Sequence, residues 1–147
     1  MRGHRFHEQT RLPHPVERVF PFFAGAANLQ RITPPELGFR ILTPGVTMHE
    51  GARISYSLSL FGIRFEWLTE ITRWDPPHEF VDVQLRGPYR QWIHTHTFRP
   101  DGDGTLMDDT VDYALPLQPF GEVAAPLIAL QVRRIFKYRS RVIPKLL

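Results

Sequence analysis

The chain has 147 residues, enough for one domain with a hydrophobic core. It contains no cysteine, which excludes disulfides, thiolate metal sites and cysteine nucleophiles. The formal net charge is only +3, but the positive charge is uneven, because residues 133–147 carry six Lys or Arg and no acid.

Aromatic side chains are frequent, with 11 Phe, 4 Tyr and 3 Trp. Such bulky groups fill cores and also line ligand pockets, so composition does not separate the two uses. The first ten residues, MRGHRFHEQT, lack the apolar stretch of a signal peptide, and the apolar segment 123–132 is too short to span a bilayer. We therefore expect a soluble, cytoplasmic protein without integral membrane contact.

The N-terminal part of the chain predicts a strand followed by short helices. Residues 5–12 alternate in polarity as a strand does, and Pro13 and Pro15 end it. A short helix is then indicated by four apolar residues at helical spacing, namely Val16, Val19, Phe20 and Phe23. Residues 24–31 predict another helical turn or two.

The middle of the chain has a period of two and predicts further strands. They cover residues 39–43, 52–60, 63–74, 79–85, 91–99 and 105–115. The connections between most of them are short, which favours antiparallel neighbours, because parallel pairing needs a crossover of about a dozen residues or more. With residues 5–12, this predicts a seven-stranded antiparallel sheet.

Residues 123–147 predict one long helix with an apolar side and a basic side. The apolar side carries Ala124, Ile128, Val132, Ile135, Phe136, Val142, Ile143 and Leu146. The basic side carries Arg133, Arg134, Lys137, Arg141 and Lys145. Arg139 is an exception, since it falls near the centre of the apolar side. A guanidinium there needs an acceptor or a ligand, unless its stem carries it out to water.

Three segments resemble a known superfamily. They are VFPFFAGAANLQRITPP (19–35), FVDVQLRGPYRQWIHTHTF (80–98) and MDDTVDYALP (107–116). With the order of elements over residues 1–147, they are similar to START-related, polyketide-cyclase-like proteins, also called SRPBCC or helix-grip proteins, and to a bacterial branch of that superfamily described as ligand-binding.

The resemblance implies one α+β domain over residues 1–147. In it, a curved seven-stranded antiparallel sheet surrounds a long C-terminal helix, two short helices follow the first strand, and a deep cavity separates sheet and helix. The superfamily includes lipid carriers, polyketide cyclases, hormone receptors and chaperone activators, so the resemblance supplies no particular reaction.

Alternation along the strands predicts which side chains face the long helix. In segment 91–99 the inward set is Trp92, His94, His96 and Phe98. The same argument adds candidate ligand-binding residues from other strands, namely Tyr56, Phe65, Trp67, Asp82, Gln84, Asp109 and Tyr113. Phe136 and Arg139 of the last helix complete the predicted site.

The polar members of this site have the residue types of a metal centre. His94 and His96 share one face of a strand, and Asp82 and Asp109 come from neighbouring strands. Imidazole and carboxylate groups are ligands of zinc and iron. A His-X-His pair is a weak signal, however, and a structural or ligand-orienting hydrogen-bond network explains the same residues. We predict no metal and no cofactor.

The leading hypothesis is a binding protein for a small, largely apolar or amphipathic ligand, such as a lipid, an isoprenoid or an aromatic polyketide-like molecule. The alternative is a polyketide cyclase/dehydratase-like enzyme with His94 or His96 as base, helped by a carboxylate. Asp82 or Asp109 would orient the base, and Arg139 would stabilise the anion. In a purely structural account, one of these carboxylates neutralises Arg139 in a buried pair.

A third hypothesis is an interaction module that uses the basic face of the last helix against an acidic protein, nucleic acid or a membrane. That face lacks interleaved exposed aromatic residues, so we expect no nucleic-acid partner. A solvated helix face also explains the charge. The sequence leaves a homodimer open.

Overall fold

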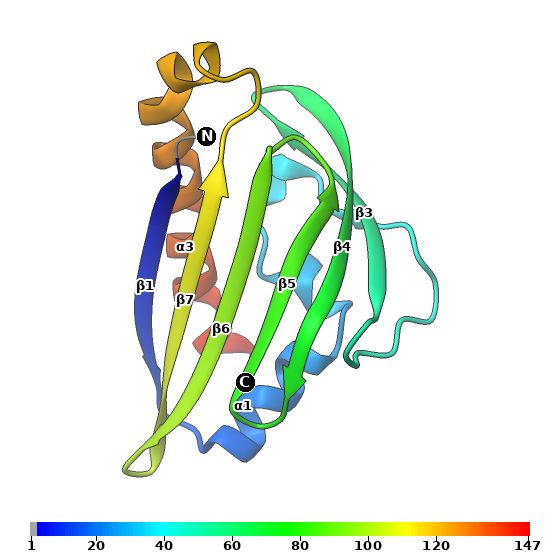
Figure 1. The fold of residues 1–147 in the computed structure, drawn as a ribbon. Coiled ribbons are helices and arrows are strands. Elements are labelled where there is room, and N and C mark those ends of the chain that lie inside the picture. Colours follow the sequence, from blue (N-terminus) through cyan, green and yellow to red (C-terminus); the bar gives the residue numbers. More distant parts are fainter. Residues whose placement is uncertain (1–2) are drawn as a thin grey trace.

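The computed structural model describes residues 3–147 and shows a curved antiparallel sheet packed against one long helix (Figure 1). The strands lie in the order β1-β7-β6-β5-β4-β3-β2. Their bounds are β1 His4–Leu12, β2 Arg40–Ile41, β3 Arg53–Leu60, β4 Ile63–Asp75, β5 Glu79–Arg86, β6 Gln91–Asp101 and β7 Gly104–Ala114. Neighbouring strands are antiparallel, so the predicted seven-stranded α+β fold is confirmed.

The helices also follow the predicted order. The helices are α1 Val16–Ala24, α2 Asn28–Arg31 and α3 Ala125–Leu146. Two short 3-10 turns, η1 Pro35–Leu37 and η2 Phe120–Ala124, precede β2 and α3 respectively. α3 begins two residues later than predicted, with Pro126 in its first turn, where a missing N–H costs no helical hydrogen bond. Within residues 3–147, no helix is both long and apolar enough to cross a bilayer.

The strand predicted over residues 39–43 is shorter in the structure. The backbone N–H groups of Leu42 and Thr43 both donate to the carbonyl of Ser55, over 2.8 and 3.3 Å. Two residues therefore oppose one, and the regular ladder stops. β2 keeps only Arg40 and Ile41.

α1 closes one end of the sheet. Val16, Val19, Phe20 and Phe23 are all buried, as their helical spacing predicts. The rings of Phe20 and Phe23 each lie 5.2 Å from the ring of Phe98 on β6, centroid to centroid. These residues belong to the first of two apolar clusters in the core.

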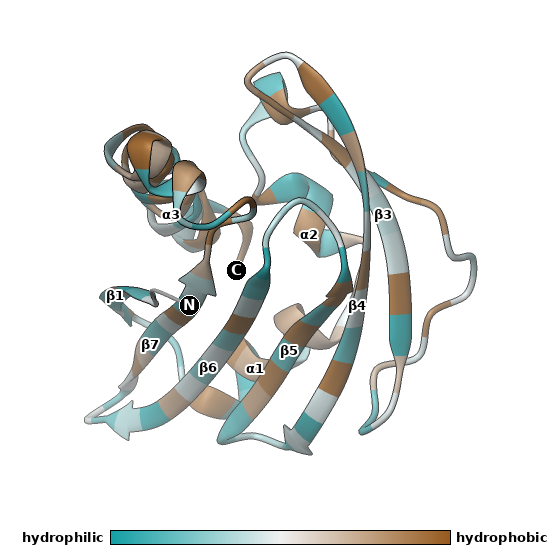
Figure 2. Cartoon of the chain, turned by 45° about the horizontal axis from the view of Figure 1, so that its top comes forward, coloured by the Kyte–Doolittle hydropathy of each residue, from teal (hydrophilic) through white to brown (hydrophobic). Residues whose placement is uncertain are grey.

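The second apolar cluster lies around the other part of α3. It includes Trp67 on β4, Trp92 on β6, and Val132 and Phe136 of α3. Figure 2 shows α3 beside the β1 and β7 edge, while β3 and β4 curve away on the other side.

Candidate ligand-binding site

A cavity lies between α3, the short helices and the inner face of β3 to β6. Its open space is ≈ 950 Å³, counting the part that opens to solvent. The lining includes these residues of the predicted site: Tyr56, Trp67, Asp82, Trp92, His94, His96, Phe136 and Arg139.

Aromatic rings form one wall of the cavity. Trp67 stacks on Tyr56 with centroids 5.7 Å apart, and it meets Trp92 at 5.3 Å with the ring planes perpendicular. Tyr89 lies 4.8 Å from Trp92. Such contacts between aromatic rings stabilise the wall beyond the burial of their apolar area.

Other residues of the predicted site lie outside the lining. Phe65 lines a second pocket instead of this cavity. Phe98 is packed under α1, and Tyr113 stacks on His4 at 5.3 Å. Strand alternation predicts the face of a side chain but not its position along the cavity, which explains these differences.

Gln84 supports the wall rather than lining it. Its Nε2 donates to the carbonyl of Tyr89 over 2.7 Å, and its Oε1 accepts from the Tyr89 N–H over 3.2 Å. These two hydrogen bonds hold the β5–β6 turn in place. Tyr89 was missed from the sequence because it lies in that turn, where no periodicity indicates direction.

The α1–α2 region and the loop before β3 also supply lining residues that strand alternation did not indicate. They are Phe23, Leu29, Ile32, Thr33 and Met48. Thr33 donates its hydroxyl to the carbonyl of Leu29 over 2.6 Å, which satisfies it locally. The helices therefore close this side of the cavity with mainly apolar groups.

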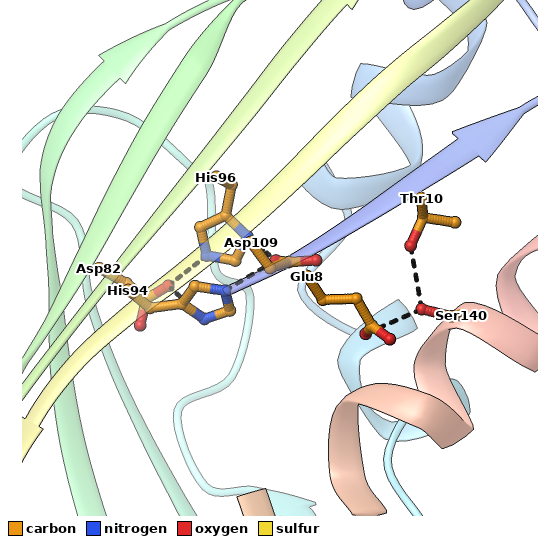
Figure 3. A network of polar contacts seen from close by, with 7 residues as sticks. All are labelled: Glu8, Thr10, Asp82, His94, His96, Asp109 and Ser140. Carbon is orange, nitrogen blue, oxygen red and sulfur yellow. Dashed lines mark hydrogen bonds and ion pairs between the residues drawn. The ribbon is translucent and has the colours of Figure 1, made fainter. Parts of the chain in front are cut away.

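The four predicted polar residues of the sheet form one cluster (Figure 3). His94 Nε2 lies 2.7 Å from Asp109 Oδ1, and His96 Nε2 lies 2.7 Å from Asp82 Oδ2. Two longer approaches cross these bonds, His94 Nδ1 to Asp82 Oδ2 at 3.8 Å and His96 Nδ1 to Asp109 Oδ1 at 3.4 Å. We call these four residues the His–Asp cluster.

Strand register brings the His–Asp cluster together. Asp82 on β5 is the direct partner of His94 on β6, and Asp109 on β7 is the direct partner of His96. The short hydrogen bonds run diagonally between these pairs, so each histidine is held by both neighbouring strands. Phe80 stacks on His96 at 3.9 Å and thereby covers one side of the cluster.

The carboxyl groups of the cluster are ionised at neutral pH. Burial favours the neutral form, but the hydrogen bond from His96 and the charges nearby lower the pKa of Asp82 below its usual value. Burial also disfavours the charged form of Asp109, but hydrogen bonds from His94 and His96 hold its pKa well below the usual range. Both carboxylates therefore accept hydrogen bonds from imidazole N–H groups.

The pKa values of the two histidines shift in opposite directions. Burial and the neighbouring charge on His96 lower the pKa of His94 to about 4, against its hydrogen bond to Asp109. Burial also opposes the charge on His96, but Asp109 and Asp82 both stabilise it and raise its pKa. Within the cluster, the two carboxylates therefore favour the charged form of His96, whereas the neutral form of His94 is favoured.

Arg139 of α3 is buried beside this cluster. Its charge contributes to the lowered pKa of Asp82 and Asp109, and its Cζ lies 5.1 Å from the centroid of the Phe136 ring. The buried ion pair considered from the sequence is absent among the described residues, since neither carboxylate comes within 4.0 Å of the guanidinium. Arg139 Nε and Nη2 are buried without a hydrogen-bond partner.

Asp82, His94 and His96 are the residues that would hold a metal ion. One donor atom from each lies within 4.8 Å of the others. However, the two imidazole rings stack with centroids 3.5 Å apart and planes 28° from parallel, so their lone pairs run side by side rather than converge. The donor types suit zinc or iron, but the ring orientation does not.

A second polar network joins β1 to α3 next to Arg139 (Figure 3). Ser140 donates to Glu8 Oε2 over 3.0 Å, and its hydroxyl lies 3.0 Å from that of Thr10. Glu8 is the direct strand partner of Asp109. This network fixes the position of α3 over β1, and hence the position of Arg139 over the sheet.

Comparison with known proteins gives a family. Residues 12–137 match the family described as polyketide cyclase / dehydrase and lipid transport. A search of curated proteins found no match.

Solved structures share the fold over nearly the whole chain. An aromatase/cyclase, Zhui, from a Streptomyces species has a TM-score of 0.79 and 14% identity, covering 98% of this chain and 93% of that one. A START superfamily protein from Mycobacterium smegmatis has a TM-score of 0.72 and 14% identity, covering 98% and 99%. Norcoclaurine synthase from Thalictrum flavum, in complex with dopamine and hydroxybenzaldehyde, has a TM-score of 0.70 and 13% identity, covering 98% of this chain and 88% of that one.

Proposed function

Because the chain belongs to the polyketide cyclase / dehydrase and lipid transport family, we propose that it binds a small, largely apolar molecule in the cavity between the sheet and α3. The ligand class is a lipid, an isoprenoid or an aromatic polyketide-like compound. We further propose that the ligand carries an acidic or oxygen-rich end, which is held by donors of the cavity wall.

The observation that carries this proposal is the kind of polar atom left unpaired in the lining. Trp67 Nε1, Arg139 Nε and Arg139 Nη2 are buried without a hydrogen-bond partner. All three are N–H donors. An unpaired buried donor costs about 1–3 kcal/mol, so a ligand acceptor is strongly favoured there. The rest of the wall is mainly apolar.

Matched ligand pairs test the proposal. We expect long-chain or aromatic carboxylic acids to raise the melting temperature and to quench the fluorescence of Trp67 and Trp92, which line the cavity. The methyl esters of the same acids keep the apolar part and lose the charge, so they should bind about 10- to 100-fold more weakly. Absence of binding by either series to the folded protein would overturn the proposal.

A cyclase-type enzyme is the second candidate, and the His94–Asp109 pair favours it. Asp109 orients His94 through Nε2, which leaves Nδ1 as the basic atom beside the cavity. With a pKa of about 4, however, His94 is a weak base at neutral pH. Turnover of a polyketide-like substrate with a rate controlled by one ionisation near pH 4 is the expected signature of this candidate.

A further inference from the structure

Exposed apolar side chains gather at one end of the molecule. They come from the β3–β4 hairpin, the β7–α3 connection and the first turns of α3, which lie together at the top of Figure 1. We call the following residues the apolar tip: Phe61, Leu117, Phe120, Val123, Leu127 and Leu130. Their exposed fractions run from 52% to 87%. Large exposed apolar patches on a protein surface mark contact sites.

The backbone adds a second, independent sign. Phe61 has φ 52° and Leu117 has φ 57°, and in the described part of the chain no other non-glycine residue has a positive φ. Left-handed backbone is unfavourable for bulky side chains. The two-residue turn Phe61-Gly62 between the paired Leu60 and Ile63 takes positive φ at both positions, which closes the β3–β4 hairpin. Asn or Gly suits such positions better than a bulky apolar residue, so the exposed side chains of Phe61 and Leu117 point to a function other than the turn itself.

The solvent-facing stripe of α3 changes from apolar to basic along the helix. Val123, in the η2 turn before α3, and Leu127 and Leu130 are exposed, and the same stripe continues with exposed Arg134, Lys137 and Arg141. Arg134 is paired with Glu36 over 3.0 Å, so Lys137 is the first basic residue of the stripe without an ion pair to an acid among the described residues. At about 1.5 Å per residue, Arg134 lies roughly 6 Å and Lys137 roughly 10 Å beyond Leu130. Residues 123–147 contain no acid.

We propose that the apolar tip inserts into the surface of an anionic lipid bilayer and that the basic stripe of α3 contacts its headgroups. Interfacial segments bury their apolar side about 5–10 Å deep, which matches the distance from the tip to the first basic residues. Anionic headgroups complement the positive charge. A second copy of the chain would not complement this charge. A two-fold interface at the tip would bring the basic stripes of the two copies towards each other, and they would repel.

The apolar tip also adjoins a second pocket. Its lining includes Phe61, Pro116 and Ile128. Leu60 and Tyr89 line both this pocket and the main cavity. If the cavity binds an apolar ligand, as proposed above, docking places this pocket against the membrane from which the ligand enters.

Vesicle co-sedimentation tests the docking without any added ligand, so it does not depend on the proposed function. Full-length protein is mixed with phosphatidylcholine vesicles, with or without about a third phosphatidylglycerol, at physiological ionic strength. We expect binding to the anionic vesicles, weakened by added salt. Failure of the wild-type protein to sediment with anionic vesicles overturns the proposal.

The double variant Phe61→Asn, Leu117→Asn separates docking from folding. Asn tolerates left-handed backbone, so the melting temperature should stay equal or rise, while vesicle affinity should fall at least about 10-fold. The matched control is Leu42→Asn, an exposed leucine beside β2, which should bind as the wild type does. Equal losses in both variants, or a dimer in sedimentation velocity that only the double variant dissolves, would contradict the proposal.

Discussion

The imidazole rings of His94 and His96 stack with their centroids 3.5 Å apart, and their pKa values shift in opposite directions, down to about 4 for His94 and upwards for His96. Each ring donates to a different carboxylate, His94 to Asp109 and His96 to Asp82. Charge on His96 lowers the pKa of His94, because two adjacent buried imidazolium ions would repel each other. This asymmetry makes the behaviour of the protein with pH predictable.

We expect the free energy of unfolding to be greatest near pH 6.5. The lowered pKa of His94 contributes stability above pH 6.5 that is lost as pH falls towards 4, up to about 3 kcal/mol. The raised pKa of His96 contributes stability below pH 6.5 that is lost as pH rises through its folded value. Urea denaturation at a series of pH values measures the loss of stability on the acid side and on the alkaline side of this maximum.

Single substitutions show which histidine causes which loss of stability with pH. His94→Gln should flatten the loss on the acid side, and His96→Gln should flatten the loss on the alkaline side. A wild-type stability that does not change between pH 4 and pH 8 would contradict the assigned charge states.

Asp109→Asn should cost about 3 kcal/mol of unfolding free energy, because Asp109 is buried and stabilises both imidazole rings. Asp108→Asn is the matched control on the next residue. Asp108 faces the other side of β7, where its carboxylate contacts His7 and Gln9 near the surface, so its replacement should cost less than about 1 kcal/mol. Similar losses for both variants would show that the His–Asp cluster does not stabilise the fold.

Arg139→Met keeps most of the buried stem and removes the cation. Without an ion pair to break, we expect a loss of only about 1–2 kcal/mol, arising from the weaker stabilisation of Asp82 and Asp109. Binding of a carboxylate ligand should fall about 10- to 100-fold, while its methyl ester is unaffected. Arg133→Met, on the exposed face of the same helix, is the control and should leave both ligands unchanged.

Gln84→Ala should speed ligand exchange. The substitution removes both hydrogen bonds to the backbone of Tyr89, so the β5–β6 turn opens more readily beside the cavity. Stopped-flow fluorescence should show faster ligand dissociation, with Gln9→Ala on the exposed outer side of β1 as control. Unchanged dissociation would mean that ligands leave by another route.

Metal analysis of protein purified without a polyhistidine tag should find less than about a tenth of an equivalent of zinc or iron, because the stacked rings of His94 and His96 do not converge on one ion. Stoichiometric metal would contradict this prediction and would require one ring to rotate.

Most of the secondary structure could be predicted from the sequence, because hydrophobic periodicity follows directly from strand and helix geometry. The period-two segments became strands, and the apolar side of residues 123–147 supplied the buried Val132, Phe136 and Ile143 of α3. The inward direction of Trp92, His94 and His96 also followed from alternation alone. Arg139 was recognised as a misplaced charge by the same reasoning.

Only the tertiary structure decided how these residues meet. The diagonal bonds of the His–Asp cluster depend on the register of β5, β6 and β7, which local periodicity does not specify. The roles of Gln84 and Tyr89 depend on the path of a turn, and the unpaired state of Arg139 depends on where α3 is held over the sheet. The sequence by itself thus determined which side chains are inward, whereas the long-range packing decided which of them form a wall, a cluster or an unpaired donor.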